Sequence, residues 1–297
     1  YKALIEQTTT TDMSAEQIHR IGLDEVARVR HDMLAIKDKV GFQGTLKEFF
    51  DHLRTDPQFK FASKQALLDG YNAIRVRVDA AVPKLFSLTP KSPFEIRPVP
   101  GYSEQNEAAG SYRQGTPDGT RPGIFFVNTY DLPSRTTPGM ETLFLHEAIP
   151  GHHFQIALAQ ENEALPNFLR FNGNTAFVEG WALYAESLGP ELGMFTDPYQ
   201  AFGSLDDEML RAMRLVLDTG IHAKGWTREQ AIRYMLDNSA QSETDARAEV
   251  ERYIAIPGQA LAYKVGALTI RRLRTEAEQT LGERFDPREF HAQVLDT

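Results

Sequence analysis

The chain has 297 residues, of which 41% are hydrophobic and 25% are charged, and its formal net charge is −9. This composition is that of a globular protein and excludes a disordered chain, while an acidic sequence without a basic stripe argues against nucleic acid as a partner. No apolar run approaches the ~20 residues of a membrane span. The absence of cysteine excludes disulfides, thiolate zinc sites and a cysteine nucleophile.

The first 90 residues predict packing helices. The threonine-rich run Thr8–Thr11 favours a loop or an extended arm. Capping boxes at residues 14–17 and 45–48 each begin a helix. A long helix is expected from about Ser63 to Phe86, because apolar residues recur there at helical spacing.

Residues 91–135 change character and predict a small β element near residues 93–130. Frequent prolines exclude long helices there, and residues 94–97 and 123–128 are typical of short strands. A sheet edge beside a peptidase site can bind an extended peptide by strand addition. We take Val127–Thr129 as the candidate edge, with Asn128 binding substrate; a plain structural hairpin is an equal alternative.

The most informative stretch holds three histidines and a glutamate within residues 146–153. Imidazole and carboxylate groups at short spacing suit zinc. A His-Glu pair has a further meaning, because in zinc peptidases the histidine binds the metal and the adjacent glutamate acts as general base. His146 and Glu147 form such a pair, in a helix that we expect Thr137 and Pro138 to begin.

The spacing of the histidines departs from the usual one. The position four residues after His146 is occupied by Pro150, and the next histidines are His152 and His153. On an unbroken helix the later of these would lie about 10 Å further along the axis. Because Pro150 and Gly151 interrupt a helix, we interpret Ile149–Gly151 as a bulge that returns His152, or alternatively His153, to the metal.

A third ligand is expected on the apolar helix over residues 177–186. A lone buried carboxylate such as Glu179 is costly unless it is paired or bound to a metal. Glu186 shares its helix face and could support a ligand from behind. Each residue alone is more often structural, as a hydrogen-bonded core histidine or a capped glutamate.

Arg214, Asp218 and His222 are spaced four apart, so they share one face of a helix. The stripe is either a surface ion-pair ladder or a set of groups that point into the site. Residues 242–253 and 259–274 predict two more helices, separated by a break at residues 256–258.

Four blocks, at residues 146–155, 179–186, 218–226 and 252–264, resemble the bacterial DUF885 family. That family is distantly similar to the helical gluzincin peptidases, such as the Taq-type carboxypeptidases and angiotensin-converting enzyme. Their pattern is H-E-x-x-H plus a downstream glutamate on another helix, and this chain departs from it by two extra residues inside the motif. The resemblance implies zinc held by His146, His152 and Glu179, with Glu147 as base.

The same resemblance implies groups that stabilise the tetrahedral intermediate. Gluzincins place a tyrosine hydroxyl against it, and Tyr263 is the candidate, with Tyr253 as rival; both are alternatively core aromatics. The block at residues 218–226 favours His222 beside the substrate carbonyl or oxyanion. Arg252 or Lys264 could hold a substrate carboxylate.

We therefore expect a mainly α, gluzincin-like fold with a small sheet, and zinc-dependent hydrolysis of short peptides or chain ends, as in a carboxypeptidase. The alternatives are a non-hydrolytic metal-binding protein and a two-His-one-carboxylate iron enzyme. Because the chain begins at Tyr1 rather than Met, we expect a single fragment of a larger domain, with packing helices over 1–90, a β element over 91–135 and metal-site helices over 136–297. The sequence leaves the exported and cytoplasmic compartments, and the oligomeric state, open.

Overall fold

The computed structural model describes residues 1–296; Thr297, the last residue of the predicted metal-site region, lies outside them. The fold is mainly helical with one small sheet, as the sequence predicts. The strands are β1 (Phe94–Pro98), β2 (Gly110–Arg113) and β3 (Gly123–Val127). The α-helices are α1 (Lys2–Thr9), α2 (Ala15–Lys39), α3 (Leu46–Thr55), α4 (Lys64–Ala81), α5 (Met140–Glu147), α6 (His152–Glu161), α7 (Asn167–Phe171), α8 (Thr175–Glu186), α9 (Pro198–Lys224), α10 (Arg228–Asn238), α11 (Glu243–Ala255), α12 (Ala262–Leu281) and α13 (Pro287–Leu295).

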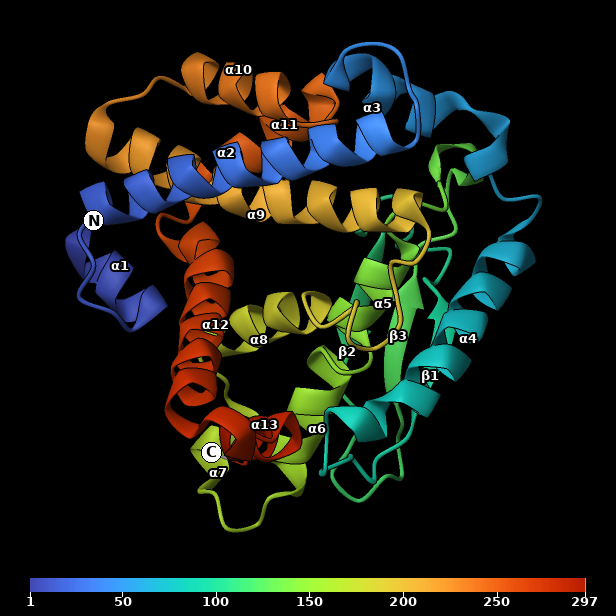
Figure 1. Ribbon diagram of the computed structural model, residues 1–297, viewed down its shortest axis with the longest axis vertical. Coiled ribbons are helices and arrows are strands. Elements are labelled where there is room, and N and C mark those ends of the chain that lie inside the picture. Colours follow the sequence, from blue (N-terminus) through green and yellow to red (C-terminus); the bar gives the residue numbers. More distant parts are fainter. Residues whose placement is uncertain (297) are drawn as a thin grey trace.

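The long helices α2 and α9 run side by side and form the upper layer of Figure 1, where α3, α10 and α11 pack against them. The capping boxes at residues 14–17 and 45–48 are present and begin α2 and α3. The loop predicted at Thr8–Thr11 is wrong in its first half, because α1 continues to Thr9. This helix is held by burial of Ile5 in a small core with α2, α9 and α12.

The sheet has the strand order β1-β3-β2, with β1 parallel and β2 antiparallel to β3. The prediction that Val127–Thr129 forms a sheet edge is therefore wrong, since β3 is the central strand and both of its sides are paired. The strand β2 was not predicted, and within the described residues only β3 pairs with it. The two edge strands are β1 and β2, and β2 packs beside α5 and α6.

Helix α8 lies between α12 on one side and α5 on the other, near the centre of the molecule (Figure 1). The helices α8 and α12 meet at Gly180 and Gly266. A β-carbon added at Gly180 would lie 2.5 Å from the Cα of Gly266, so only glycine permits this approach of the two backbones. As a result, α8 is held by direct backbone packing.

No helix within residues 1–296 has the length and apolar character that a bilayer span requires.

Candidate metal centre

The helix that carries His146 stops at the next residue. Helix α5 ends at Glu147 and α6 begins at His152, so the interruption is a loop between two helices rather than the predicted bulge within one. Helix α5 also begins at Met140, two residues later than the predicted start at Pro138. The Pro150 carbonyl accepts a hydrogen bond from Trp181 Nε1 at 2.7 Å, which ties the loop to α8.

Gly151 makes the sharp return possible. A β-carbon at this position would lie 1.9 Å from the carbonyl oxygen of His146, so any larger residue would collide with the end of α5. Because the chain doubles back here, the first residue of α6 comes to lie beside the last turn of α5. The rings of His146 and His152 are 4.7 Å apart between centroids and nearly perpendicular.

The structure brings His146, His152 and Glu179 together in one group of candidate metal ligands, the metal cluster. One ligand atom of each lies within 4.8 Å of the others. Glu179 Oε2 is 3.7 Å from His146 Nε2 and 3.5 Å from His152 Nε2. Donors bound tetrahedrally to one zinc ion at ~2.0–2.1 Å lie about 3.3–3.4 Å from one another, so the three side chains can hold a divalent metal with small adjustments.

A carboxylate and a hydroxyl support His146 from behind. Its Nδ1 lies 2.6 Å from Glu186 Oε1, and Thr142 Oγ1 donates to Glu186 Oε2 at 2.8 Å. When Nδ1 donates its proton to Glu186, the lone pair of Nε2 points toward Glu179 and is free for a metal. By contrast, Nδ1 of His152 is buried without a hydrogen-bond partner among residues 1–296.

The acidic surroundings change the protonation of the cluster. Burial alone would lower the pKa of His146, but its contacts with Glu179 and Glu186 outweigh this effect and raise the pKa to about 10. Burial would raise the pKa of Glu179, yet the two imidazoles hold it well below its usual range. A metal would take the place of the imidazole proton, so binding should release a proton.

The cluster opens into a cavity of about 780 Å³, a size typical of small-ligand sites. Residues from β2, α5, α6, α8, α9, α11 and α12 line it. Glu147 is 8% exposed and lines the cavity. Its carboxylate makes no hydrogen bond or ion pair with any other described residue, although it adjoins the cluster.

His153, the alternative ligand, points elsewhere. Its Nδ1 lies 3.0 Å from the Tyr112 hydroxyl, and its ring packs on Phe94 at 4.7 Å between centroids. Burial, and then the charge of Arg75, lowers the pKa of His153 to about 4. This residue is a neutral histidine of the core beside the sheet.

Tyr263 lines the cavity, whereas His222 does not. His222 lies near the end of α9, with Nε2 3.0 Å from the Tyr253 carbonyl oxygen. Asp218 on the same stripe accepts a hydrogen bond from the Gly258 amide at 3.1 Å. The stripe therefore leaves the cavity after Arg214, and the structure does not bring His222 to the metal cluster.

The three predicted substrate-binding residues also lie away from the cavity lining. Asn128 donates to the carbonyl oxygens of Glu104 and Glu107 at 2.8 Å and is buried in this loop. Arg252 donates to Gln259 at 2.8 Å. Their side chains stabilise turns of the chain instead of facing the cluster.

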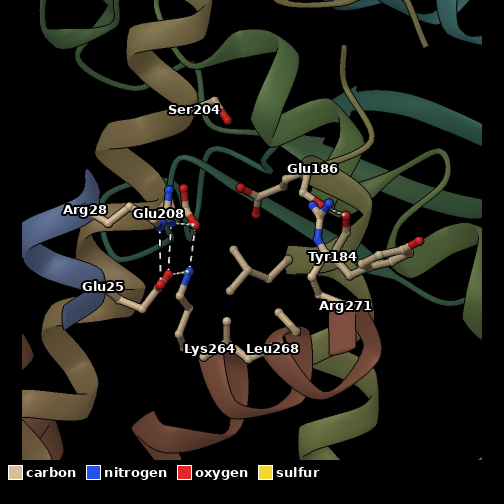
Figure 2. Close-up of a pocket in the computed structure, with 12 residues that line it drawn as sticks. Glu25, Arg28, Tyr184, Glu186, Ser204, Glu208, Lys264, Leu268 and Arg271 are labelled. Atoms are coloured by element: carbon tan, nitrogen blue, oxygen red, sulfur yellow. Dashed lines mark hydrogen bonds and ion pairs between the residues drawn. The ribbon is translucent and has the colours of Figure 1, made fainter. Parts of the chain in front are cut away.

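Lys264 lines a different cavity of about 420 Å³, shown in Figure 2. Its ammonium group lies 2.7 Å from Glu25 and 2.6 Å from Glu208. These carboxylates come from α2 and α9, and Glu25 lies more than 200 residues before Lys264 in the sequence. The direction of the lysine side chain therefore depends on contacts between distant parts of the chain.

Sequence reasoning missed Arg135, Asp207 and Arg211, which all line the metal cavity. Positions 207, 211 and 214 lie on one face of α9, so the residues of this face that line the cavity precede Arg214 in the sequence, whereas the predicted ones follow it. The signal was present in the spacing, but the spacing alone does not say which end of a long helix meets the site.

The DUF885 family model, described as a bacterial protein of unknown function, matches residues 1–297. The fold is similar to a solved structure from Colwellia psychrerythraea, provisionally described as a lipoprotein, with a TM-score of 0.95 and 42% identity over 99% of this chain and 52% of that one. It is also similar to a structure from Shewanella oneidensis, provisionally described as a lipoprotein of unknown function, with a TM-score of 0.84 and 26% identity over 100% of this chain and 56% of that one.

The chain thus spans about half the length of these two proteins. A comparison with curated proteins gives no match. The family match covers every residue, and one solved relative shares both sequence and fold over nearly the whole chain. The chain therefore belongs to the bacterial DUF885 family.

Proposed function

We propose that this chain carries the catalytic centre of a zinc-dependent peptidase that cleaves short peptides or the ends of longer ones. The observation that carries the proposal is the meeting of His146, His152 and Glu179 in one cavity, with Glu147 unpaired beside them. Two ligands from neighbouring turns and a glutamate from another helix are similar to the gluzincin arrangement, despite the two extra residues in the motif.

The chemistry assigned to each residue follows from its position. A bound zinc ion would polarise the scissile carbonyl and make water a stronger nucleophile near neutral pH. The Glu147 carboxylate, which has no competing partner, accepts the proton of the attacking water and passes it to the leaving amine. The Tyr263 hydroxyl donates a hydrogen bond to the developing oxyanion.

The open edge of β2 is suited to hold the substrate backbone. Gly110, Ser111 and Tyr112 line the cavity. Because the Asn128 amide donates to the Ala109 carbonyl, alternation along an antiparallel pair turns the amide and carbonyl groups of Gly110 and Tyr112 away from β3. An extended peptide could pair with them as an added strand. This edge replaces the one predicted at Asn128.

Two observations separate this proposal from its alternatives. An iron enzyme with the same donor set has no need of an unpaired carboxylate beside the metal, and a purely structural metal site would close its fourth position rather than face a cavity.

The provisional description of both solved relatives as lipoproteins supports placing the activity outside the cytoplasm.

The test is a Glu147→Gln variant of the full-length protein, compared with Glu163→Gln, which changes an exposed glutamate. We expect Glu147→Gln to lose hydrolysis of a short-peptide library while keeping its zinc, and Glu163→Gln to keep both. Turnover would be followed by mass spectrometry and metal content by elemental analysis. Undiminished turnover by Glu147→Gln would refute the base assignment, and zinc without turnover in the unaltered protein would refute the peptidase.

A further inference from the structure

Three arginines line the same cavity as the metal cluster. Arg211 and Arg214 lie three residues apart on one face of α9, and Arg135 lies in the segment that precedes α5. Each has a buried guanidinium nitrogen without a hydrogen-bond partner within residues 1–296: Nε of Arg135, Nε of Arg211 and Nη1 of Arg214. The cavity therefore holds donors that the protein itself leaves unused.

The three differ in how far their charge is already paired. Arg214 contacts Glu249 at 3.1 Å and the Tyr253 hydroxyl at 3.2 Å. No ion pair or side-chain hydrogen bond joins Arg211 or Arg135 to any other described residue. Arg211 instead lies over the Tyr263 ring, 5.2 Å from its centroid. Both residues are partly exposed, but a buried donor without a partner, such as the Nε of each, is costly, so Arg211 and Arg135 are available for an anion that is not part of this chain.

The carboxylates of the cavity do not fill this role. Glu249 is paired with Arg214, and Asp245 accepts a hydrogen bond from Ser242. Asp207 lies one turn before Arg211 on α9 without forming an ion pair with it. Burial raises the pKa of Asp207 to about 6. At neutral pH such a carboxyl group is still mostly ionised, but no ion pair joins it to Arg211 among the described residues, so the Arg211 guanidinium stays open to an anion.

We propose that Arg211, assisted by Arg135, binds the free C-terminal carboxylate of a peptide substrate. This inference rests on the proposed peptidase function and narrows it to cleavage near C-terminal ends. The planar guanidinium matches a carboxylate with two parallel hydrogen bonds. Arg211 then takes the place that the sequence had assigned to Arg252 or Lys264. An acidic side chain of the substrate offers the same chemistry, so the test must separate the two.

The experiment measures binding to zinc-loaded, full-length Glu147→Gln protein by calorimetry, so that the ligand is not consumed. Three short peptides are compared: one with a free C-terminus, the same peptide amidated, and an amidated peptide with a C-terminal glutamate side chain. We expect the free acid to bind about 10- to 100-fold more tightly than either amide, as is typical of charge-assisted hydrogen bonds.

Adding Arg211→Gln should remove that difference, Arg135→Gln should reduce it, and Arg211→Lys should retain part of it. Arg272→Gln is the matched control, because Arg272 pairs with Glu276 on the exposed face of α12. Unfolding temperatures of all variants report whether the fold is kept. Should Arg211→Gln unfold, Arg211→Lys and Arg135→Gln still decide the matter.

The outcomes separate the two proposals. Equal affinity for free acid and amide, or a difference that survives Arg211→Gln, overturns the carboxylate assignment. Tight binding of the amidated glutamate peptide transfers the anion to a side chain and overturns the chain-end assignment. Binding that depends on Arg211, in a protein that cleaves no peptide, keeps the carboxylate site and refutes the peptidase.

Discussion

Two cavities of this molecule, the one around Lys264 and the one around the metal cluster, use charged residues in opposite ways. Around Lys264, cations and carboxylates pair with one another: the lysine contacts Glu25 and Glu208, and Arg28 contacts both of these glutamates (Figure 2). Around the metal cluster, Arg211 and Glu147 remain unpaired. Both cavities are polar and lie between packed helices, so polarity alone does not identify a binding site. Hydrogen-bond donors and acceptors without partners in the protein are the better indication.

One residue connects the two cavities. Glu186 lines the cavity of Figure 2 and also accepts the hydrogen bond from His146. The cavity around Lys264 thus lies directly behind His146, on the side away from Glu179. Substitutions around Lys264 should therefore change the stability of the fold, whereas substitutions in the cavity of the metal cluster should change metal and ligand binding. Glu186 lines the Lys264 cavity, but its substitution should weaken metal binding.

The largest expected effect is the loss of zinc from His152→Ala. Removing one of three protein ligands leaves too few donors for a stable tetrahedral site. We expect zinc content after dialysis to fall from about one ion per chain to a trace. His31→Ala, which changes an exposed histidine, should keep its zinc. Full zinc occupancy in His152→Ala would show that His152 is not a metal ligand.

Gly151→Ala should lower the free energy of unfolding by about 3 kcal/mol, since the new methyl group would overlap the His146 carbonyl and force the loop to move. Urea unfolding of the variant would measure this loss. Gly101→Ala is the control, because nothing lies within 4 Å of a β-carbon there, and its stability should change by less than about 0.5 kcal/mol. Equal stability of the two variants would show that the return between α5 and α6 tolerates a side chain.

Glu186→Gln should weaken zinc binding about 10- to 100-fold, the usual cost of losing a carboxylate behind a ligating histidine. Competition with a chromogenic chelator would measure the affinity. Thr142→Val removes the other hydrogen bond of Glu186 and should have a smaller effect in the same direction. An affinity equal to that of the unaltered protein would mean that packing alone orients His146.

Lys264→Met should lower the free energy of unfolding by about 2 kcal/mol at neutral pH, because Glu25 and Glu208 lose a buried partner. Zinc affinity should not change. Lys47→Met, at an exposed lysine, is the control. A change in zinc affinity as large as that of Glu186→Gln would remove the distinction between the two cavities.

The effect of Lys264→Met should depend on pH in a defined direction. Burial would raise the pKa of Glu25, but Arg28 and Lys264 lower it from 4.5 to about 2. A carboxyl group whose pKa is depressed in the folded state stabilises the fold above its unfolded value and loses that contribution on acidification. The difference from the unaltered protein should therefore shrink as the pH falls from about 4.5 toward 2. A constant difference would show that Glu25 is not the group involved.

The parts of the site that sequence reasoning could reach are those encoded locally. The His-Glu pair, the Pro-Gly interruption and Glu179 on an apolar helix each carry their own signal, and the capping boxes of α2 and α3 do the same for the fold. The strand β2 has only four residues in a segment rich in turns, so its pairing with β3 has no local pattern. The direction of Lys264 depends on carboxylates from two distant helices, which no spacing within α12 reveals.

The glycine contact between α8 and α12 has a consequence for the kind of ion that the candidate centre would favour. With no side chain between Gly180 and Gly266, the backbone of α8 cannot move toward α12 unless α12 moves too, so the backbone of Glu179 keeps its place beside His146 and His152. A calcium ion, which binds six or more oxygen atoms, would find one carboxylate and two imidazoles there. This donor set favours small ions that form short bonds to nitrogen.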